Sequence, residues 1–243
     1  MGWFFPGRCA MRIKIGFIVF QLLLGSHELT LAQVGLGGVD AVMTVPTAEI
    51  LEDGHVVVGF GYIPKPHGLW LAPDHDNLPY FATFGFLPFL EISFRATKAL
   101  KRDLGSIGDR MASVRIQLFR ETPSRPAITI GVHDIAGLVR SANRHFYSLY
   151  GVMTKSIDIL PHVSIKPTVG YGVDWPKPEL MKEFNGIFGG VSLGYRDFFF
   201  LKAEYNDLLN VGLGIDLLNF LAVNLIFIDG KDLGVGANFK KRL

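Results

Sequence analysis

The chain has 243 residues, of which 49% are hydrophobic and 19% are charged, so it can form one substantial domain but is unusually apolar for a soluble protein. Its 24 lysines and arginines nearly balance its 22 acidic residues, which argues against a nucleic-acid partner. The lone cysteine, Cys9, excludes a disulfide framework and a metal site built from cysteines.

Residues 1–32 are predicted to be a secretory signal peptide. Basic residues precede the apolar run Ile15–Leu24, and the small residues around Ala32 suit cleavage before Gln33. A run of about ten apolar residues is too short to cross a bilayer as a helix. Met11 fits the start of a signal peptide better than Met1 does, so residues 1–10 are interpreted as an upstream extension or a mis-assigned start.

Polar and apolar residues alternate along short segments from residue 55 onward. In the segment 90–97, Leu90, Ile92 and Phe94 occupy one side, while the polar residues that alternate with them, beginning with Glu91, occupy the other. This period of two is typical of a strand with two different environments. About twelve strands are expected on this basis: Val56–Tyr62, Tyr80–Phe86, Leu90–Thr97, Ala112–Leu118, Ile128–His133, Phe146–Lys155, Val163–Tyr171, Ile187–Tyr195, Phe199–Tyr205, Asn210–Asp216, Leu221–Ile228 and Leu233–Lys240.

The connectors between these strands alternate in length through the first nine strands. Long links are expected at 63–79, 98–110, 135–144 and 173–185, and tight turns at Leu87–Pro88, Glu121–Arg125, Ser156–Pro161 and Arg196–Asp197. This alternation is typical of outer-membrane barrels. Lipid offers no hydrogen-bond partners, so such a sheet must close on itself. Residues 55–243 are therefore predicted to be all-β and to form a closed antiparallel transmembrane β-barrel of about 12 strands.

Glycines occupy many polar-face positions where a water-facing strand would carry larger polar residues. Gly59, Gly61, Gly212 and Gly214 are examples. Glycine in a strand often marks a close approach of backbone or ligand, so a narrow or plugged lumen is expected. Residues 33–54, which precede the first strand, are the segment that could enter the lumen as a small plug.

A family resemblance follows from four motifs. They are Thr44–Gly54 followed at once by Val56–Tyr62, the stretch Pro88–Arg95, the strand Arg115–Phe119, and Pro126–Asp134. Together they resemble the YjbH-like family, outer-membrane barrels associated with exopolysaccharide production. The family's glycine- and threonine-rich turn is replaced here by Leu138–Arg144. The resemblance implies a place in polysaccharide export or its envelope machinery, without naming a substrate.

Inward-facing charged and polar side chains are the first candidate site. They are Glu91, Arg95, Arg115, Gln117, His133, Lys166, Lys202 and Glu204. A functional interpretation is a polar path or a set of contacts to an anionic sugar. The alternative interpretation is mutual pairing that satisfies charges inside a narrow barrel, and it is the one we favour.

Two aromatic residues are candidates for surface sugar stacking, namely Trp70 and Trp175, although aromatics that anchor loops at a membrane boundary explain them equally well. Trp70 shares its loop with His67, Asp74, His75 and Asp76, whose spacing matches no recognised metal-ligand motif. No metal or cofactor site is therefore expected.

His133–Asp134 together with Ser148 or Ser141 suggests a hydrolase as an alternative. The sequence has no nucleophile elbow and no phosphate-cradling loop, so no enzymatic activity is expected.

The predicted function is a non-enzymatic role in exopolysaccharide secretion or envelope organisation, in the bacterial outer membrane. The expected partners are outer-membrane lipid, polysaccharide with its export machinery, and the barrel-assembly machinery; no nucleic acid is expected. The alternatives are a small-solute diffusion channel, a membrane-embedded lipid or ester hydrolase, and a soluble periplasmic ligand-binding barrel. Periodicity alone does not separate the last of these from a membrane barrel.

Overall fold

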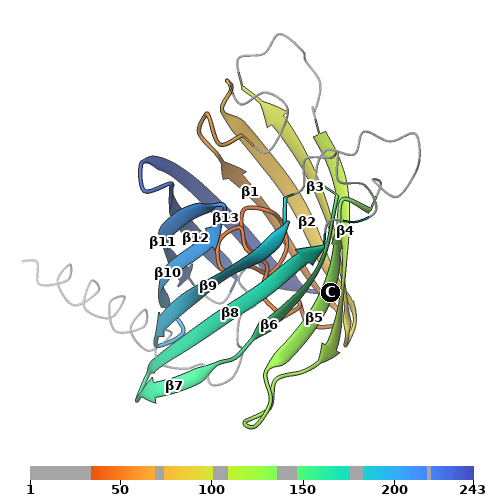
Figure 1. Cartoon of the computed structure of the whole chain (residues 1–243), viewed down its shortest axis with the longest axis vertical. Coiled ribbons are helices and arrows are strands. Elements are labelled where there is room, and N and C mark those ends of the chain that lie inside the picture. Colours follow the sequence, from red (N-terminus) through yellow and green to blue (C-terminus); the bar gives the residue numbers. More distant parts are fainter. Residues whose placement is uncertain are drawn as a thin grey trace, which may run out of the picture. The chain divides into compact units, whose positions relative to one another are not determined.

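The computed structural model describes residues 34–68, 74–100, 109–135, 147–173, 175, 183–217 and 220–243, and the expected signal peptide lies outside them. The strands form one antiparallel sheet (Figure 1). They are β1 His55–Tyr62, β2 Asn77–Leu87, β3 Leu90–Ala99, β4 Asp109–Phe119, β5 Ala127–His133, β6 Ser148–Thr154, β7 Ile157–Leu160, β8 Val163–Val173, β9 Gly186–Tyr195, β10 Phe199–Asn206, β11 Leu208–Leu217, β12 Leu221–Ile228 and β13 Asp232–Arg242. The described part of the chain contains no helix with the length and hydropathy needed to span a membrane.

The sheet closes into a 12-strand barrel. β1 pairs with β13, and β6 pairs with β8, so the ring has no open end at these strands. β6 and β7 pair with successive parts of β8, as Thr154↔Thr168 and Ile157↔Ile165 show. They are therefore two parts of one interrupted strand. The prediction of a closed all-β barrel with about twelve strands is confirmed.

The interruption between β6 and β7 corrects one predicted turn. Ser156–Pro161 is not a turn, because residues 157–160 continue along β8 as β7 and only Pro161 and His162 connect the two strands. At the interruption, the Glu121 carboxylate accepts hydrogen bonds from Ser156 N at 3.0 Å and from Lys155 Nζ at 3.0 Å.

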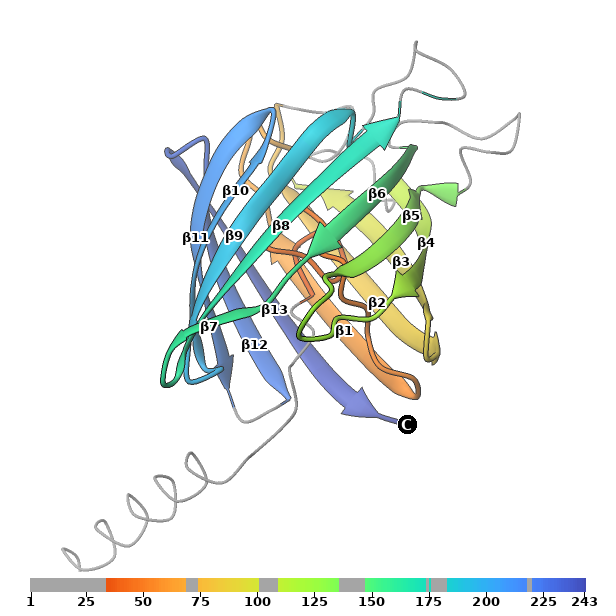
Figure 2. The same ribbon diagram turned by 60° about the horizontal axis from the view of Figure 1, so that its bottom comes forward.

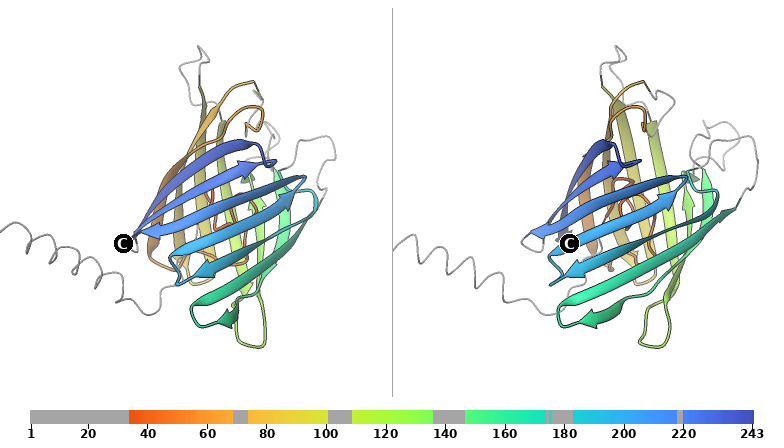
Figure 3. Two further views of the ribbon diagram at one scale, coloured as in Figure 1. Left: turned by 90° about the vertical axis from the view of Figure 1, so that its left-hand side faces the viewer. Right: turned by 60° about the vertical axis from the view of Figure 1, so that its left-hand side comes forward.

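The predicted alternation of links is confirmed by the strand bounds. Long links at 63–76, 100–108, 134–147 and 174–185 alternate with short ones at 88–89, 120–126, 161–162 and 196–198. At Arg196 and Asp197 the φ angles are 55° and 52°, as expected for a tight hairpin turn whose backbone twist matches that of the flanking strands. β8 to β13 then run side by side along one wall of the barrel (Figure 3).

The two faces of the sheet have the reverse of a soluble barrel's polarity. Inward positions hold fully buried polar side chains such as Thr83, Glu91 and Arg115, each 0% exposed. Outward positions hold apolar residues such as Phe60 and Phe94, which are 50% and 53% exposed. Because burying polar groups while exposing large apolar ones is costly in water, the exterior is suited to an apolar surrounding.

Exposed aromatic residues gather at both ends of the strands. The end with the short turns carries Phe86, Phe89, Phe119, Tyr195, Phe198, Phe220 and Phe239, and the end with the long links carries Tyr80, Tyr171, Trp175 and Tyr205. Such belts sit at the headgroup level of membrane barrels.

Candidate functional site: a segment held inside the barrel

Residues 34–54, here called the lumen segment, run through the interior of the barrel (Figure 2). Val34, Val45 and Leu51 are 1%, 0% and 0% exposed. The segment turns repeatedly, with Gly38 at a φ of 84°, and it belongs to no strand of the sheet. Buried backbone groups outside regular structure need hydrogen-bond partners. The partners of this segment therefore identify the interior residues that hold it.

Glu91 and Arg115 form the central anchor. They lie directly opposite each other on β3 and β4, with Arg115 Nη1 3.0 Å from Glu91 Oε1. Glu91 Oε2 accepts a hydrogen bond from Leu51 N at 2.8 Å. Arg115 donates to the backbone oxygens of the segment at Asp40, Thr47 and Glu49. The ion pair thus binds both the barrel wall and the lumen segment.

Glu204 of β10 anchors the segment from the opposite wall. Its Oε2 accepts hydrogen bonds from the consecutive amides of Met43, Thr44 and Val45 at 2.9, 3.0 and 3.0 Å. Successive N–H groups that converge in this way form an anion-binding concavity. Asn210 Nδ2 also donates to Glu204 Oε1 at 3.1 Å, so the carboxylate is satisfied on both sides.

Ala48 is held by neutral side chains. Its carbonyl accepts hydrogen bonds from Gln117 Nε2 at 2.8 Å and from Thr129 Oγ1 at 2.6 Å. Its amide donates to Thr154 Oγ1 at 2.8 Å. Three neighbouring strands of the barrel therefore contact one residue of the segment.

The two inward lysines differ in their partners. Lys166 Nζ lies 2.9 Å from both carboxylate oxygens of Glu49, so it belongs to the contacts of the lumen segment. Lys202 Nζ instead donates to Asn224 Oδ1 at 3.0 Å, within the barrel wall.

Asp40 is the least compensated charge of the segment. It is 1% exposed, its Oδ1 accepts a hydrogen bond from the Thr47 hydroxyl, and its Oδ2 has no hydrogen-bond partner. Burial, together with the nearby Glu49 and Glu91 carboxylates, raises the pKa of Asp40 to about 8 against the opposing effect of Arg115. A protonated Asp40 at neutral pH fits this environment.

Apolar packing completes the contacts of the lumen segment. Its apolar residues pack in three clusters with interior residues of the barrel: Val45 and Ala48 with Tyr150 and Phe188, Leu36 and Met43 with Ile226 and Ile228, and Val34 and Leu51 with Val57 and Phe81. Inward glycines make room for it. A Cβ at Gly85 would collide with the backbone of Glu52, and one at Gly236 would collide with Leu36.

A second polar cluster lies toward the long links. Glu183 Oε2 is 2.8 Å from His133 Nε2 and 3.5 Å from Arg95 Nη2. Burial would raise the pKa of Glu183, but the charges of His133 and then Arg95 lower it to about 2. His133 Nδ1 lies 3.1 Å from Ser113 Oγ. Arg95 and His133 are therefore tied to each other through a residue of the link between β8 and β9.

The structure therefore places every predicted lumen residue beside a partner, and it brings Glu91 together with Arg115 and Arg95 together with His133. His133 and Ser148 also lie directly opposite each other on β5 and β6, and Ser148 Oγ accepts a hydrogen bond from Phe184 N at 3.0 Å. Ser141 lies outside the described residues.

The candidate loop residues are dispersed. His67 Nε2 lies 2.9 Å from Asp232 Oδ2, and Asp76 Oδ1 accepts a hydrogen bond from Lys65 N. Over the described ranges, no three potential metal ligands come together. Trp175 is 57% exposed, and Trp70 lies outside the described residues.

Sequence reasoning missed several functional contacts. Glu49 and Glu183 were not singled out, because each lies outside the alternating strands. The hydroxyl residues Thr129 and Thr154 do follow an alternation signal, since both sit on the polar side of their strands.

A solved structure titled "KdgM porin" is similar, with 9% identity, a TM-score of 0.46, and coverage of 76% of this chain and 98% of that one. A structure titled "De novo design of transmembrane beta-barrels" is also similar, with 9% identity, a TM-score of 0.27, and coverage of 79% and 98%. No curated protein matches.

A family model provides the stronger match. The YjbH model, described as "Exopolysaccharide biosynthesis protein YbjH", matches residues 31–176, which include the lumen segment and the strands from β1 to β8. The motifs that carried the resemblance in the sequence all lie within this range. The chain therefore belongs to the YjbH family.

Proposed function

We propose that this chain is an outer-membrane barrel whose lumen is closed by the lumen segment, and that it serves exopolysaccharide secretion or envelope organisation without catalysing a reaction. The observation that carries the proposal is the filled interior. The inward charges at Glu91, Arg115 and Glu204 bind the segment. They are not left for a diffusing solute.

The location rests on the reversed polarity of the barrel. Phe60, Phe94 and Leu201 are each about half exposed on the outer face, at 50%, 53% and 46%. A continuous apolar belt of this kind, bounded by aromatic residues, is stable in hydrocarbon and prone to association in water. We assign the belt to lipid of the outer membrane, with assembly by the barrel-assembly machinery.

The polysaccharide role rests on the family. Its description refers to exopolysaccharide biosynthesis, and the match includes the residues that form the lumen segment. A barrel whose segment is held by hydrogen bonds to interior side chains such as Glu91 and Glu204 is suited to being a stable envelope component, or to opening only when a partner displaces the segment. Polysaccharide and its export machinery are the partners in this proposal.

The location is tested by membrane fractionation combined with heat-modifiable gel mobility. The folded barrel should enter the membrane fraction and migrate differently before and after boiling. Recovery in the soluble periplasm would contradict the membrane assignment and favour a ligand-binding barrel.

The closed lumen is tested in planar bilayers. The wild-type protein should show little conductance, and Gly85→Ala, which pushes against the backbone of Glu52, should show more. Gly151→Ala is the matched control, because a Cβ there meets nothing within 4 Å. A large steady conductance in the wild type would favour a small-solute diffusion channel.

The polysaccharide role is tested by deleting the gene in the host bacterium and measuring secreted exopolysaccharide. Output should fall, and it should be restored by the wild type and by Gly151→Ala. Unchanged output after deletion would reject the role. Hydrolysis of lipid or ester by the purified protein, lost in His133→Ala, would instead support the hydrolase alternative.

A further inference from the structure

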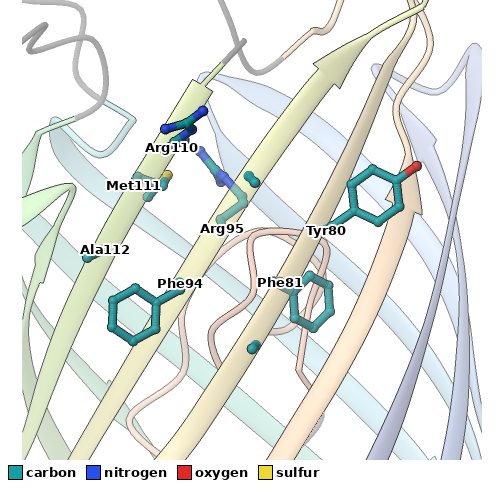
Figure 4. A pocket seen from close by; sticks show the side chains of 9 residues that line it. Tyr80, Phe81, Phe94, Arg95, Arg110, Met111 and Ala112 are labelled. Carbon is teal, nitrogen blue, oxygen red and sulfur yellow. The ribbon is translucent and has the colours of Figure 1, made fainter. Parts of the chain in front are cut away.

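The outer face of the barrel has an apolar depression over β2, β3 and β4 (Figure 4). Its volume is about 550 Å³. Two cross-strand rows form it. Tyr80, Ala96 and Arg110 are neighbours in one row, and Ala82, Phe94 and Ala112 are neighbours in the next.

The sizes of these side chains give the depression its shape. In the first row the small side chain of Ala96 lies between the large side chains of Tyr80 and Arg110. In the second row the ring of Phe94 lies between Ala82 and Ala112. Phe84 contacts the Phe94 ring edge-on, with centroids 6.5 Å apart at an interplanar angle of 72°. Shallow apolar spaces, here called the channels, therefore lie at these alanines beside a supported aromatic ring. Side chains this small beside a ring leave space that hydrocarbon chains can fill.

Two exposed cations lie at the end of the depression nearest the long links. Arg110 is directly opposite Ala96 on the neighbouring strand, and Lys98 is two residues beyond Ala96 on the same face of β3. Diagonal neighbours on one face of a sheet are roughly 7–8 Å apart. Both side chains are exposed, and one anionic group can contact both.

We propose that this depression binds a lipid with an anionic, phosphate-bearing head group, from the leaflet on the long-link side. The proposal rests on the membrane location proposed above. The head group contacts Lys98 and Arg110, and the acyl chains lie along the channels beside Phe94. A cation near a membrane surface attracts anionic lipid, and an apolar groove beneath it adds a second point of contact. The combination selects lipid over a free anion.

The experiment compares lipid retention by the purified barrel in native mass spectrometry. The probes are phosphatidylglycerol, which is anionic, and phosphatidylcholine, which is zwitterionic. The wild type should retain phosphatidylglycerol preferentially. Lys98→Gln and Arg110→Gln should each weaken that retention about fivefold. Arg196→Gln, at the opposite rim of the barrel, is the control and should leave it unchanged.

A second pair of variants tests the channels. Ala96→Phe fills the depression and should reduce retention of phosphatidylglycerol. Ala203→Phe introduces the same ring at another outward position, between Val191 and Val211, and should not. Equal retention by the wild type and by the charge variants, or equal effects of the two phenylalanines, would overturn the proposal.

The membrane location is checked first on the same samples. A barrel that fails to enter the membrane fraction contradicts the proposed function. A barrel that inserts, shows heat-modifiable mobility and retains both lipids equally contradicts the lipid site alone.

Discussion

Glu91 and Arg115 face each other across β3 and β4 as a fully buried ion pair, with 3.0 Å between Oε1 and Nη1, and both also bind the backbone of the lumen segment. A buried ion pair gains from mutual attraction only where its remaining donors and acceptors are satisfied. Here the segment supplies partners for Glu91 Oε2 and for both terminal nitrogens of Arg115, whereas Arg115 Nε has no hydrogen-bond partner among the described residues. The pair and the segment therefore stabilise each other, because removing either one leaves buried polar groups of the other without partners.

Replacing Arg115 should loosen the segment. In Arg115→Met the Glu91 carboxylate stays buried without its cation, at a cost of about 3–5 kcal/mol. Hydrogen exchange followed by mass spectrometry should show faster exchange at Met43 and Leu51. Lys155→Met is the control, because it breaks the half-buried pair with Glu121 at the rim and should leave those amides protected. Unchanged protection in Arg115→Met would mean that the ion pair does not hold the segment.

Raising the pH should weaken the seating of the segment through Asp40. Its pKa is raised from 3.8 to about 8 in the folded protein, chiefly by burial. Stability from this group is fully present below the unfolded pKa and is lost as pH rises through about 8. Exchange of the segment amides, corrected for intrinsic rates, should therefore increase between about pH 5 and 8 and level off above that range.

Asp40→Asn removes the titrating group and should flatten this dependence. Glu183 is no competing source, because its pKa of about 2 keeps it ionised throughout that range. A pH dependence that is equally steep in Asp40→Asn would assign the effect to another group.

Adding one methyl group at Gly85 should displace the segment. A Cβ there would lie 2.6 Å from Leu51 O and closer still to Glu52 O, and both are backbone atoms that cannot rotate away. Gly85→Ala should therefore lower the melting temperature of the barrel and speed proteolysis near Glu52. Gly151→Ala changes another strand glycine with open space around it, and it should behave like the wild type. If both variants behave alike, the segment shifts to accommodate the added methyl group without a loss of stability.

Strand alternation is sufficient to predict which side chains point inward. Once the period of two is recognised, Glu91, Arg115 and Glu204 must lie on the face opposite the apolar residues. The inward glycines indicate in addition that the interior is crowded. Fold class and the candidate interior residues could therefore be inferred without coordinates.

Which interior residue meets which part of the segment could not be inferred in this way. The contact of Glu204 with Met43 joins positions 161 residues apart, and no period in the sequence links an irregular segment to a strand. Glu183 was not predicted because it lies in a link, where alternation does not indicate which way a side chain points. The predicted turn at Ser156–Pro161 is wrong at residues 157–160, where Ile157 and Ile159 alternate around Asp158 as in a strand.

A cation placed at the middle of the outer face should impair assembly. Leu213 is near the middle of β11, with Leu201 and Leu225 opposite it on the neighbouring strands. In hydrocarbon, Leu213→Arg costs roughly 2–4 kcal/mol, because the guanidinium is far from both interfaces. Folding into lipid vesicles, followed by heat-modifiable mobility, should show a smaller folded fraction, whereas Leu213→Met keeps the site apolar and should fold like the wild type. If the two variants fold equally well, Leu213 does not face lipid, and the assignment of the outer face to a membrane fails with it.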